Sequence, residues 1–179
     1  MVRAWYEALE AAAVAVLDAA TPTAIPLTAG GGTTGQTLAS ELTAAFASLQ
    51  FVRGGFAMTD MFTQIDLYKA LIAAKDNDGR PLFPALGPMN TNGQSRTRWG
   101  AVDVNGVTAL PSWALAASGS VVASSYLFDR ESVHGWASAP TRLEFQYRVA
   151  YVDLAIWGYK AAAITDLSGV REITYDPVP

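Results

Sequence analysis

An alternating run of residues, Leu143-Glu-Phe-Gln-Tyr-Arg-Val-Ala-Tyr151, lies near the end of this 179-residue chain. The odd-numbered positions are all large and apolar or aromatic, whereas the even-numbered positions are mostly polar. Because successive side chains of a strand point to opposite faces, this period of two predicts a strand with one buried face. The chain then continues to a second, shorter apolar strand that ends at Ile164. With no catalytic constellation around them, these strands favour a building element over an active site.

The rest of the chain mixes helical and extended patterns. Amphipathic spacing predicts helices over residues 2–19, 34–49 and 61–74, the third capped by Thr59 or Asp60. Short apolar stretches predict strands over 51–58, 99–111 and 120–128. Pro-rich and Gly-rich segments predict a long loop over 75–98 and a turn-rich insertion over 129–140. Because helices and strands do not alternate regularly, the expected class is α+β.

The composition excludes several functions. The net charge is −4 and the pI is about 4.9, so no basic domain is available to grip nucleic acid. There are no cysteines, which excludes disulfides and thiolate chemistry. No apolar run is long enough to span a membrane, and the first residues do not resemble an export signal. Charged residues make up 16%, against about 25% in a typical soluble domain. This low charge favours subunit contacts, although an Ala-rich monomer would show it too.

Three motifs resemble chemical sites but lack an essential group. The run Gly30–Thr37 has the spacing of a phosphate-binding loop, but Gln36 stands where that loop needs its lysine. Asp76-Asn-Asp78-Gly79 resembles part of a calcium loop, but Ala85 stands where the closing glutamate would be. His134 is the sole histidine and lies in the turn-rich insertion. We therefore expect a Gly-rich turn, a polar turn and a surface or packed histidine, with no metal and no cofactor.

Five tryptophans are spread over different parts of the chain. They could form stacking platforms for bases or sugars, but their scatter favours anchoring in the core and in interfaces. Trp157, in the apolar segment after the alternating run, is expected to be buried. The five are Trp5, Trp99, Trp113, Trp136 and Trp157.

Four segments, taken in order, resemble the major capsid proteins of tailed bacteriophages, which have the HK97 fold. They are a helix ending in Leu71-Ile-Ala-Ala-Lys-Asp-Asn-Asp-Gly-Arg80, the strand Arg98-Trp-Gly-Ala-Val-Asp-Val104, the strand and turn Ser124-Ser-Tyr-Leu-Phe-Asp-Arg130, and the closing strands from Phe145 to Ile164. The likeness covers roughly Thr34–Thr174, and its specificity lies in the order and spacing of the segments.

The resemblance implies a division of the chain. Residues 1–26 would be the end of the long spine helix of a peripheral domain, residues 27–125 an axial domain near the capsomer centre, and residues 126–179 the strands that close the peripheral domain. It also implies two loops that face other subunits. The loop at the capsomer axis would present Lys75, Asp76, Asp78, Arg80, Asn90, Asn92, Arg96 and Arg98. The loop towards neighbouring capsomers would present Arg130, Glu131, His134, Trp136 and Arg142.

The chain departs from the family at its start. The family carries an N-terminal arm and an extended hairpin before the spine helix, whereas Met1 lies where that helix would already be under way. Either the chain is a truncated or downstream-start product, or those elements are supplied elsewhere. We therefore transfer no cross-linking chemistry from the family.

The expected function is that of a non-enzymatic shell subunit. The chain would associate with itself into pentamers and hexamers of an icosahedral shell, hold DNA only non-specifically, and have no contact with membranes. Scaffolding, portal or decoration proteins would be further partners. The shell would be assembled in the host bacterial cytoplasm and become the virion. One alternative is the encapsulin type of nanocompartment shell, which encloses protein. Another is a small phosphate-binding enzyme that uses the Gly30–Thr37 loop.

Overall fold

The computed structural model describes residues 2–27, 35–52, 55, 57–83, 100–115, 123–148 and 151–175. The helices are α1 (Val2–Ala20), α2 (Gly35–Gln50) and α3 (Ile65–Ala73), with 3-10 turns η1 (Trp113–Leu115) and η2 (Leu167–Gly169). The strands of the body are β1 (Ala24–Leu27), β2 (Asp60–Thr63), β3 (Val102–Val104), β4 (Val107–Pro111), β5 (Ala123–Phe128) and β10 (Val170–Tyr175). Four more strands lie outside the body: β6 (Val133–Ala137), β7 (Thr141–Arg148), β8 (Tyr151–Trp157) and β9 (Lys160–Ile164).

A six-stranded mixed sheet forms the centre of the body, in the order β1-β10-β5-β2-β4-β3. The β1–β10 and β2–β4 pairs are parallel, and the other pairs are antiparallel. Pro26 lies in β1, at an edge of the sheet, where a residue without a backbone N–H is tolerated. The last strand of the described chain, β10, therefore lies between two strands from much earlier in the sequence.

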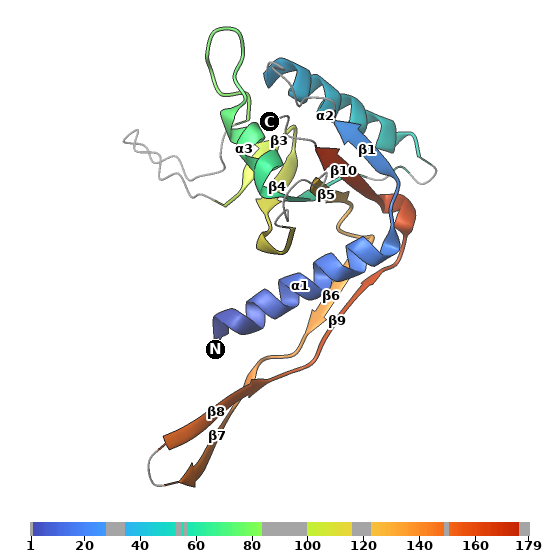
Figure 1. The fold of residues 1–179 in the computed structure, drawn as a ribbon. Coiled ribbons are helices and arrows are strands. Elements are labelled where there is room, and N and C mark those ends of the chain that lie inside the picture. Colours follow the sequence, from blue (N-terminus) through green and yellow to red (C-terminus); the bar gives the residue numbers. More distant parts are fainter. Residues whose placement is uncertain are drawn as a thin grey trace, which may run out of the picture.

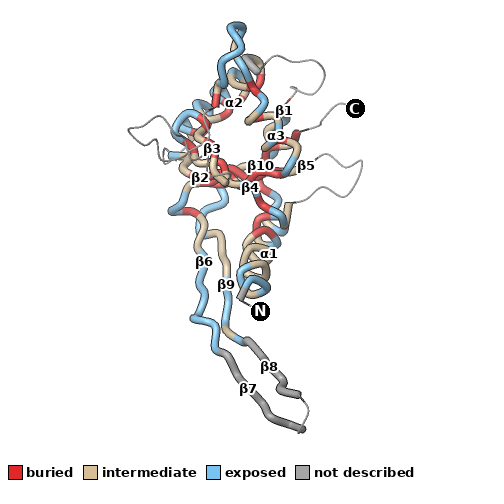
Figure 2. Tube along the Cα trace, turned by 90° about the vertical axis from the view of Figure 1, so that its left-hand side faces the viewer, coloured by how far each residue is buried: buried red, intermediate tan, exposed pale blue. Residues whose placement is uncertain are grey.

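Both faces of this sheet are covered. Helices α2 and α3 bring buried leucines, among them Leu42 and Leu67, onto the face that carries Leu127 and Ile173. The C-terminal end of α1 covers the opposite face, where Leu17 packs against Tyr126 and Phe128. Since Leu127 alternates with Tyr126 and Phe128 along β5, one strand serves both layers. Figure 2 shows the resulting band of buried residues across the body.

A long hairpin stands away from the body (Figure 1). Strands β6 and β9 form its near half and β7 and β8 its far half, each half being a two-stranded antiparallel sheet. We refer to residues 133–164 as the ribbon. Helix α1 lies beside the near half.

The mixed α+β class is confirmed, and so are the first two helices. The third helix is shorter than predicted: residues 60–63 form β2, and the helix begins only at Ile65. The predicted caps Thr59 and Asp60 are therefore wrong. Gln64 is the N-cap instead, and its side-chain oxygen accepts the N–H of Asp66 at 2.7 Å. The apolar residues of 60–63 fit either element, but their burial between β4 and β5 makes them a strand.

Three further predictions need correction. The described part of 51–58 holds a turn and irregular backbone rather than a strand. The stretch predicted as one strand from 99 to 111 is a hairpin of β3 and β4, whose turn residues Asn105 and Gly106 have φ of 53° and 88°. Positive φ at both positions is what a two-residue hairpin turn requires. The insertion at 129–140 contains β6, so His134 and Trp136 lie on a strand and not in a loop.

The ribbon also changes the expectation for Trp157. Its side chain is 45% exposed rather than buried, because β8 stands off the body and no second layer covers this residue. Trp113 and Trp136 are likewise more than half exposed. For these three tryptophans anchoring in the core is wrong, and anchoring in an interface stays a prediction. The one-sided burial predicted for residues 143–151 falls on side chains outside the described part.

Candidate subunit interface

Helix α1 holds the near half of the ribbon in place through two contacts. Lys160, on β9, donates from its Nζ to the carbonyl oxygen of Ala8 at 2.8 Å. Gly158 lies against the Trp5 ring, so closely that a Cβ on Gly158 would stand 2.6 Å from a Trp5 ring carbon. Only glycine permits this approach without displacement of the indole ring. The ribbon is therefore oriented against the helix at the point where it leaves the body.

A second set of contacts ties α1 to the body. The Glu10 carboxylate accepts from Ser112 Oγ at 2.5 Å and from the backbone N–H of Trp113 at 3.1 Å. Near the end of the helix, the Tyr126 hydroxyl donates to Asp18 at 2.5 Å. Burial of Tyr126, together with this carboxylate, raises the pKa of its hydroxyl above the ordinary value. Helix α1 thus bridges the ribbon and the central sheet.

The base of the ribbon is fixed by an ion pair. The Arg130 guanidinium donates to both carboxylate oxygens of Asp60, at 2.9 and 3.0 Å. Asp60 is 7% exposed, and the Thr59 hydroxyl donates to the same carboxylate. The contact with Asp60 raises the pKa of Arg130. Because a forked contact fixes geometry as well as charge, it sets the direction in which the chain leaves β5 for β6.

Exposed aromatic side chains gather along the near half of the ribbon. Trp136 is 56% exposed and Tyr159 is 75% exposed. Trp136 contacts the His134 ring at a centroid distance of 5.8 Å, and Tyr159 meets Trp157 edge to face. Large amphipathic rings at an exposed site are typical of protein interfaces. Within the described residues, nothing covers this surface.

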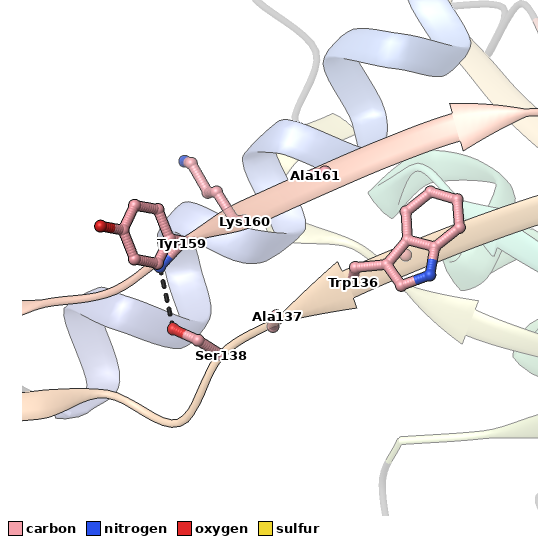
Figure 3. A pocket seen from close by; sticks show the side chains of 7 residues that line it. Trp136, Ala137, Ser138, Tyr159, Lys160 and Ala161 are labelled. Carbon is pink, nitrogen blue, oxygen red and sulfur yellow. Dashed lines mark hydrogen bonds between the residues drawn. The ribbon is translucent and has the colours of Figure 1, made fainter.

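A shallow hollow lies among these residues (Figure 3). Both strands line it, from Gly135 to Ser138 on one side and from Tyr159 to Ala161 on the other. Ser138 and Tyr159 close it at the far end, where the backbone N–H of Tyr159 donates to Ser138 Oγ at 2.9 Å. A smaller hollow of about 230 Å³ lies between these strands and residues Leu9, Ala12 and Ala13 of α1. Aromatic rings and alanines make up most of the first lining and alanines most of the second, which suits packing against another protein better than binding of a polar ligand.

The residues expected at the capsomer axis are described only in part. Lys75 and Pro81 form an isolated antiparallel bridge, and Gly79 lies in the turn between them with a φ of 80°. One Asp76 oxygen accepts the backbone N–H groups of Asp78 and Arg80. This is the polar turn expected in place of a calcium loop. Four members lie outside the described residues: Asn90, Asn92, Arg96 and Arg98.

The residues expected to face neighbouring capsomers lie in two parts of the structure, the turn after β5 and the strand β6. Arg130 and Glu131 lie in the turn after β5, where Asp129 accepts the N–H of Glu131. His134 and Trp136 lie next to each other on β6. The side chain of Arg142 lies outside the described part. The structure thus places one cation at the base of the ribbon and the two rings on its surface.

Sequence reasoning missed the residues that hold the ribbon. Asp60 was assigned to a helix cap, Trp5 was predicted only as one of five anchoring tryptophans, and Glu10 and Gly158 were not singled out. Their roles depend on contacts between segments that are far apart in sequence, for which the chain offers no local signal. One feature of the sequence could have predicted that Tyr159 is exposed: Tyr159 follows a glycine that comes directly after a strand.

The described residues give no support for a metal site or for a membrane-spanning helix. No group of three His, Asp or Glu side chains lies close enough there to hold a metal ion. None of the described helices combines the length and apolar character that crossing a bilayer requires. Most of the Gly30–Thr37 loop lies outside the described residues, which begin again at Gly35 with α2.

Solved structures with a similar architecture come from phages and related particles. A chain of the Gordonia phage Cozz superposes with a TM-score of 0.53 and 15% identity, over 88% of this chain and 50% of its own. A chain from the capsid of an empty GTA particle gives 0.54 and 11%, over 86% and 48%. This is the HK97-type capsid fold. A virus-like particle from Pyrococcus furiosus shares the capsid fold, with a TM-score of 0.57 and 8% identity over 94% and 63%.

The present chain therefore spans between 48% and 63% of the length of these three capsid-fold chains. No model of a known protein family and no characterised protein sequence matches it. The likeness lies in the arrangement of helices, sheet and ribbon and not in the sequence.

Proposed function

We propose that this chain is a structural subunit of a capsid shell and acts by self-association rather than catalysis. The observation that carries the proposal is the ribbon, which stands off the body and exposes aromatic side chains. A lone two-stranded hairpin is at best marginally stable in water. Contact with neighbouring subunits would cover it, and the capsid fold of the chain supports this reading.

The two parts of the molecule would have different places in the shell. Residues 27–125 would lie near the capsomer centre, whereas residues 1–26 and 126–179 would form the peripheral part with α1 and the ribbon. Strand β10 would then tie the peripheral part back into the central sheet, since it pairs with both β1 and β5. Packing of α1 against both parts supports a fixed orientation between them.

The turn at 75–81 would lead into the loop at the capsomer axis. In this arrangement Lys75, Asp76, Asp78 and Arg80 lie at its root, and Asn90, Asn92, Arg96 and Arg98 belong to the loop itself. Deletion of Asn90–Ser95 is expected to leave the fold intact and to impair ring formation. An unfolded deletion variant would contradict the assignment of this loop to subunit contacts.

The surface towards neighbouring capsomers would be the ribbon. His134 and Trp136 are the strongest candidates for direct contact because their rings lie together on the exposed near half. Glu131 and Arg142 would lie at the margins. Arg130 would act through its contact with Asp60, by setting the direction of the ribbon.

The shell would enclose DNA without reading its sequence, since a net charge of −4 disfavours tight binding to phosphates. Scaffolding, portal and decoration proteins are further proposed partners. Assembly would take place in the host bacterial cytoplasm and yield the virion. A protein-filled nanocompartment of the encapsulin type is the second candidate, and likeness to the archaeal virus-like particle favours testing it.

Light scattering after size exclusion, followed by negative-stain electron microscopy, tests the proposal. We expect discrete rings of five or six copies, or closed particles in the megadalton range. A strictly monomeric chain at every concentration, also after co-expression with the neighbouring genes, would contradict it. Treatment of intact particles with nuclease and, in parallel, with protease then separates the two candidates: nuclease-resistant DNA indicates a capsid, and a protease-resistant protein cargo indicates a nanocompartment.

A further inference from the structure

The outer edge of β6 is an open strand edge whose hydrogen-bonding pattern can be read from the ribbon. Two backbone hydrogen bonds bracket the β6–β9 pair, from Thr165 N–H to Ser132 O and from Ser138 N–H to Tyr159 O, each 2.9 Å. In an antiparallel pair, the backbone N–H and C=O groups of every second residue bond to the partner strand. The backbone groups of the residues between them point away from that partner. With the observed register, the backbone groups of Val133, Gly135 and Ala137 therefore point away from β9.

These outward groups have no strand partner within the described residues. Natural edges of this kind are usually blunted by charged residues, proline or a bulge. The strand Val133-His-Gly-Trp-Ala137 contains no Lys, Arg, Asp, Glu or proline, and its pairing with β9 is regular. The other edge differs, because α1 lies beside β9 and receives the Lys160 ammonium group. The β6 edge is the one left open (Figure 2).

We propose that this edge pairs antiparallel with the β6 edge of a second copy of the chain, centred on Gly135. This register sets Gly135 opposite Gly135 of the second copy and Val133 opposite Ala137. All the outward N–H and C=O groups of both strands then find partners. The product is a four-stranded sheet, in the order β9–β6–β6–β9, with two-fold symmetry.

The side chains also fit this register. His134 of one copy comes to lie opposite Trp136 of the other, so that the ring pair within each ribbon is extended across the junction. Gly135 has open space where a side chain would be, so nothing at the centre obstructs the approach. No like charges oppose each other along the strand. Because α1 lies on the β9 side, the helix of neither copy blocks the junction.

This inference rests on the proposed function, because it names the surface through which two shell subunits associate. It also makes a claim that shell formation alone does not test, namely the register. The chain contains no cysteine, so a single introduced cysteine can form a disulfide between chains only with its own copy in another chain.

Cysteine cross-linking tests the register. Opposed Cα atoms of a hydrogen-bonded antiparallel pair lie about 5.5 Å apart, within disulfide range. Gly135→Cys should therefore form disulfide dimers with oxidised glutathione under non-denaturing conditions. Ala137→Cys is the matched control: its two copies would lie four residues out of register, about 13 Å apart. We expect cross-linking of Gly135→Cys to be at least tenfold faster. Equal rates, or no cross-link at either position, would overturn the proposal.

A proline variant tests the backbone bonds. Gly135→Pro removes an outward N–H that the ribbon itself does not use, whereas Gly135→Ala keeps it and adds a methyl group in open space. Dimers should weaken at least tenfold in the proline variant and remain in the alanine variant. Equal loss in both, or loss in neither, would speak against strand pairing, and the cysteine test stands if the proline variant does not fold.

The outcomes separate the two proposals. Closed particles with no Gly135→Cys cross-link would leave the shell function standing and overturn the β6 junction. Cross-linked dimers that never form rings or particles would support the junction and count against the shell function.

Discussion

At the scale of single residues, the contact between Gly158 and Trp5 is the tightest feature of the ribbon. A Cβ on Gly158 would meet two Trp5 ring carbons, at 2.6 and 2.9 Å, and Ser138 Oγ at 2.8 Å. Gly158→Ala should therefore displace the indole ring and lower the free energy of unfolding by about 1–3 kcal/mol. Urea unfolding followed by tryptophan fluorescence measures the change.

The control for this variant lies on the facing strand. A Cβ on Gly135 would meet no atom within 4 Å, so Gly135→Ala should leave stability nearly unchanged. The double variant Trp5→Leu with Gly158→Ala should recover part of the loss, since the clash is removed. An additive effect of the two substitutions would mean that the two residues do not contact each other.

Tyr126 gives a prediction about pH. Tyr126 is 3% exposed and its hydroxyl donates to Asp18, and burial and this carboxylate raise the pKa of the hydroxyl above the ordinary value near 10. Above about pH 10, the hydroxyl ionises in the unfolded chain before it does so in the folded protein. Its contribution is complete below that pH and is lost as the pH rises further.

Tyr126→Phe should therefore lose less stability than the unaltered protein between about pH 8 and pH 10.5. At pH 8 it should be less stable by about 1 kcal/mol, the usual net value of one hydrogen bond. Tyr175, whose pKa is also raised by burial, is present in both proteins and cancels from the comparison. Parallel pH profiles would contradict the role given to Tyr126.

Trp157 should matter for association and not for the fold. Its side chain is 45% exposed and contacts Tyr159 edge to face. Trp157→Ala is expected to change the free energy of unfolding by less than about 1 kcal/mol. Interface tryptophans often dominate binding, so the concentration needed for assembly should rise about tenfold or more. A large drop in melting temperature with unchanged assembly would reverse this assignment.

At the scale of elements, the far half of the ribbon should be separable from the fold. The far half stands away from the body in Figure 1, and none of the side chains described between residues 139 and 158 belongs to either core cluster. Ser138 and Tyr159 already face each other across a 2.9 Å backbone hydrogen bond, so an Asn-Gly turn could join them in place of Ala139–Gly158. The shortened chain should unfold cooperatively and form no closed particles, and its retained β6 edge should still pair into dimers.

Circular dichroism and light scattering would check this prediction together. An unaltered core requires a sharp transition at a denaturant concentration close to that of the full chain. Loss of the transition would mean that the far half contributes to the body. Particle formation by the shortened chain would remove the far half of the ribbon from the interface.

The elements that sequence alone predicted well are those whose apolar residues repeat at a regular helical spacing along their whole length. Helices α1 and α2 have apolar spacing near 3.6 residues and were placed within one or two residues. Strand β10 was missed because Val170, Ile173 and Tyr175, its buried residues, follow no strict alternation. Strand β6 was missed because Gly135 and the nearby Pro140 read as turn residues.

The candidate interface was predictable only in outline. His134 and Trp136 were selected through the family resemblance, but their place on a strand edge depends on pairing with β9. The prediction that Trp157 is buried was wrong. An apolar segment indicates that other protein atoms cover it, but it does not indicate whether those atoms belong to the same chain or to another. In a protein that associates with itself, these two cases look alike in the sequence.

At the scale of the whole molecule, the low charge predicts how association responds to salt. Only 16% of the residues are charged, so apolar burial rather than ion pairing should drive assembly. Raising sodium chloride from about 0.1 to 1 M should leave particle yield nearly constant, because screening acts mainly on exposed charges. Ammonium sulfate should promote assembly, since it strengthens apolar association. Dissociation at high sodium chloride, measured by light scattering, would contradict this.

The position of β10 has a consequence for the order of events during synthesis. This strand, at residues 170–175, fills the slot between β1 and β5, so the sheet stays open until almost the whole described chain has been translated. Helix α1 and the ribbon emerge earlier, yet Val170 is part of the core against which Leu17 packs. A growing chain therefore lacks the rigid body that orients its ribbon. If the chain assembles as we propose, translation itself would time the competence to assemble, and ribosomes working on one message could lie close together without premature joining of their products.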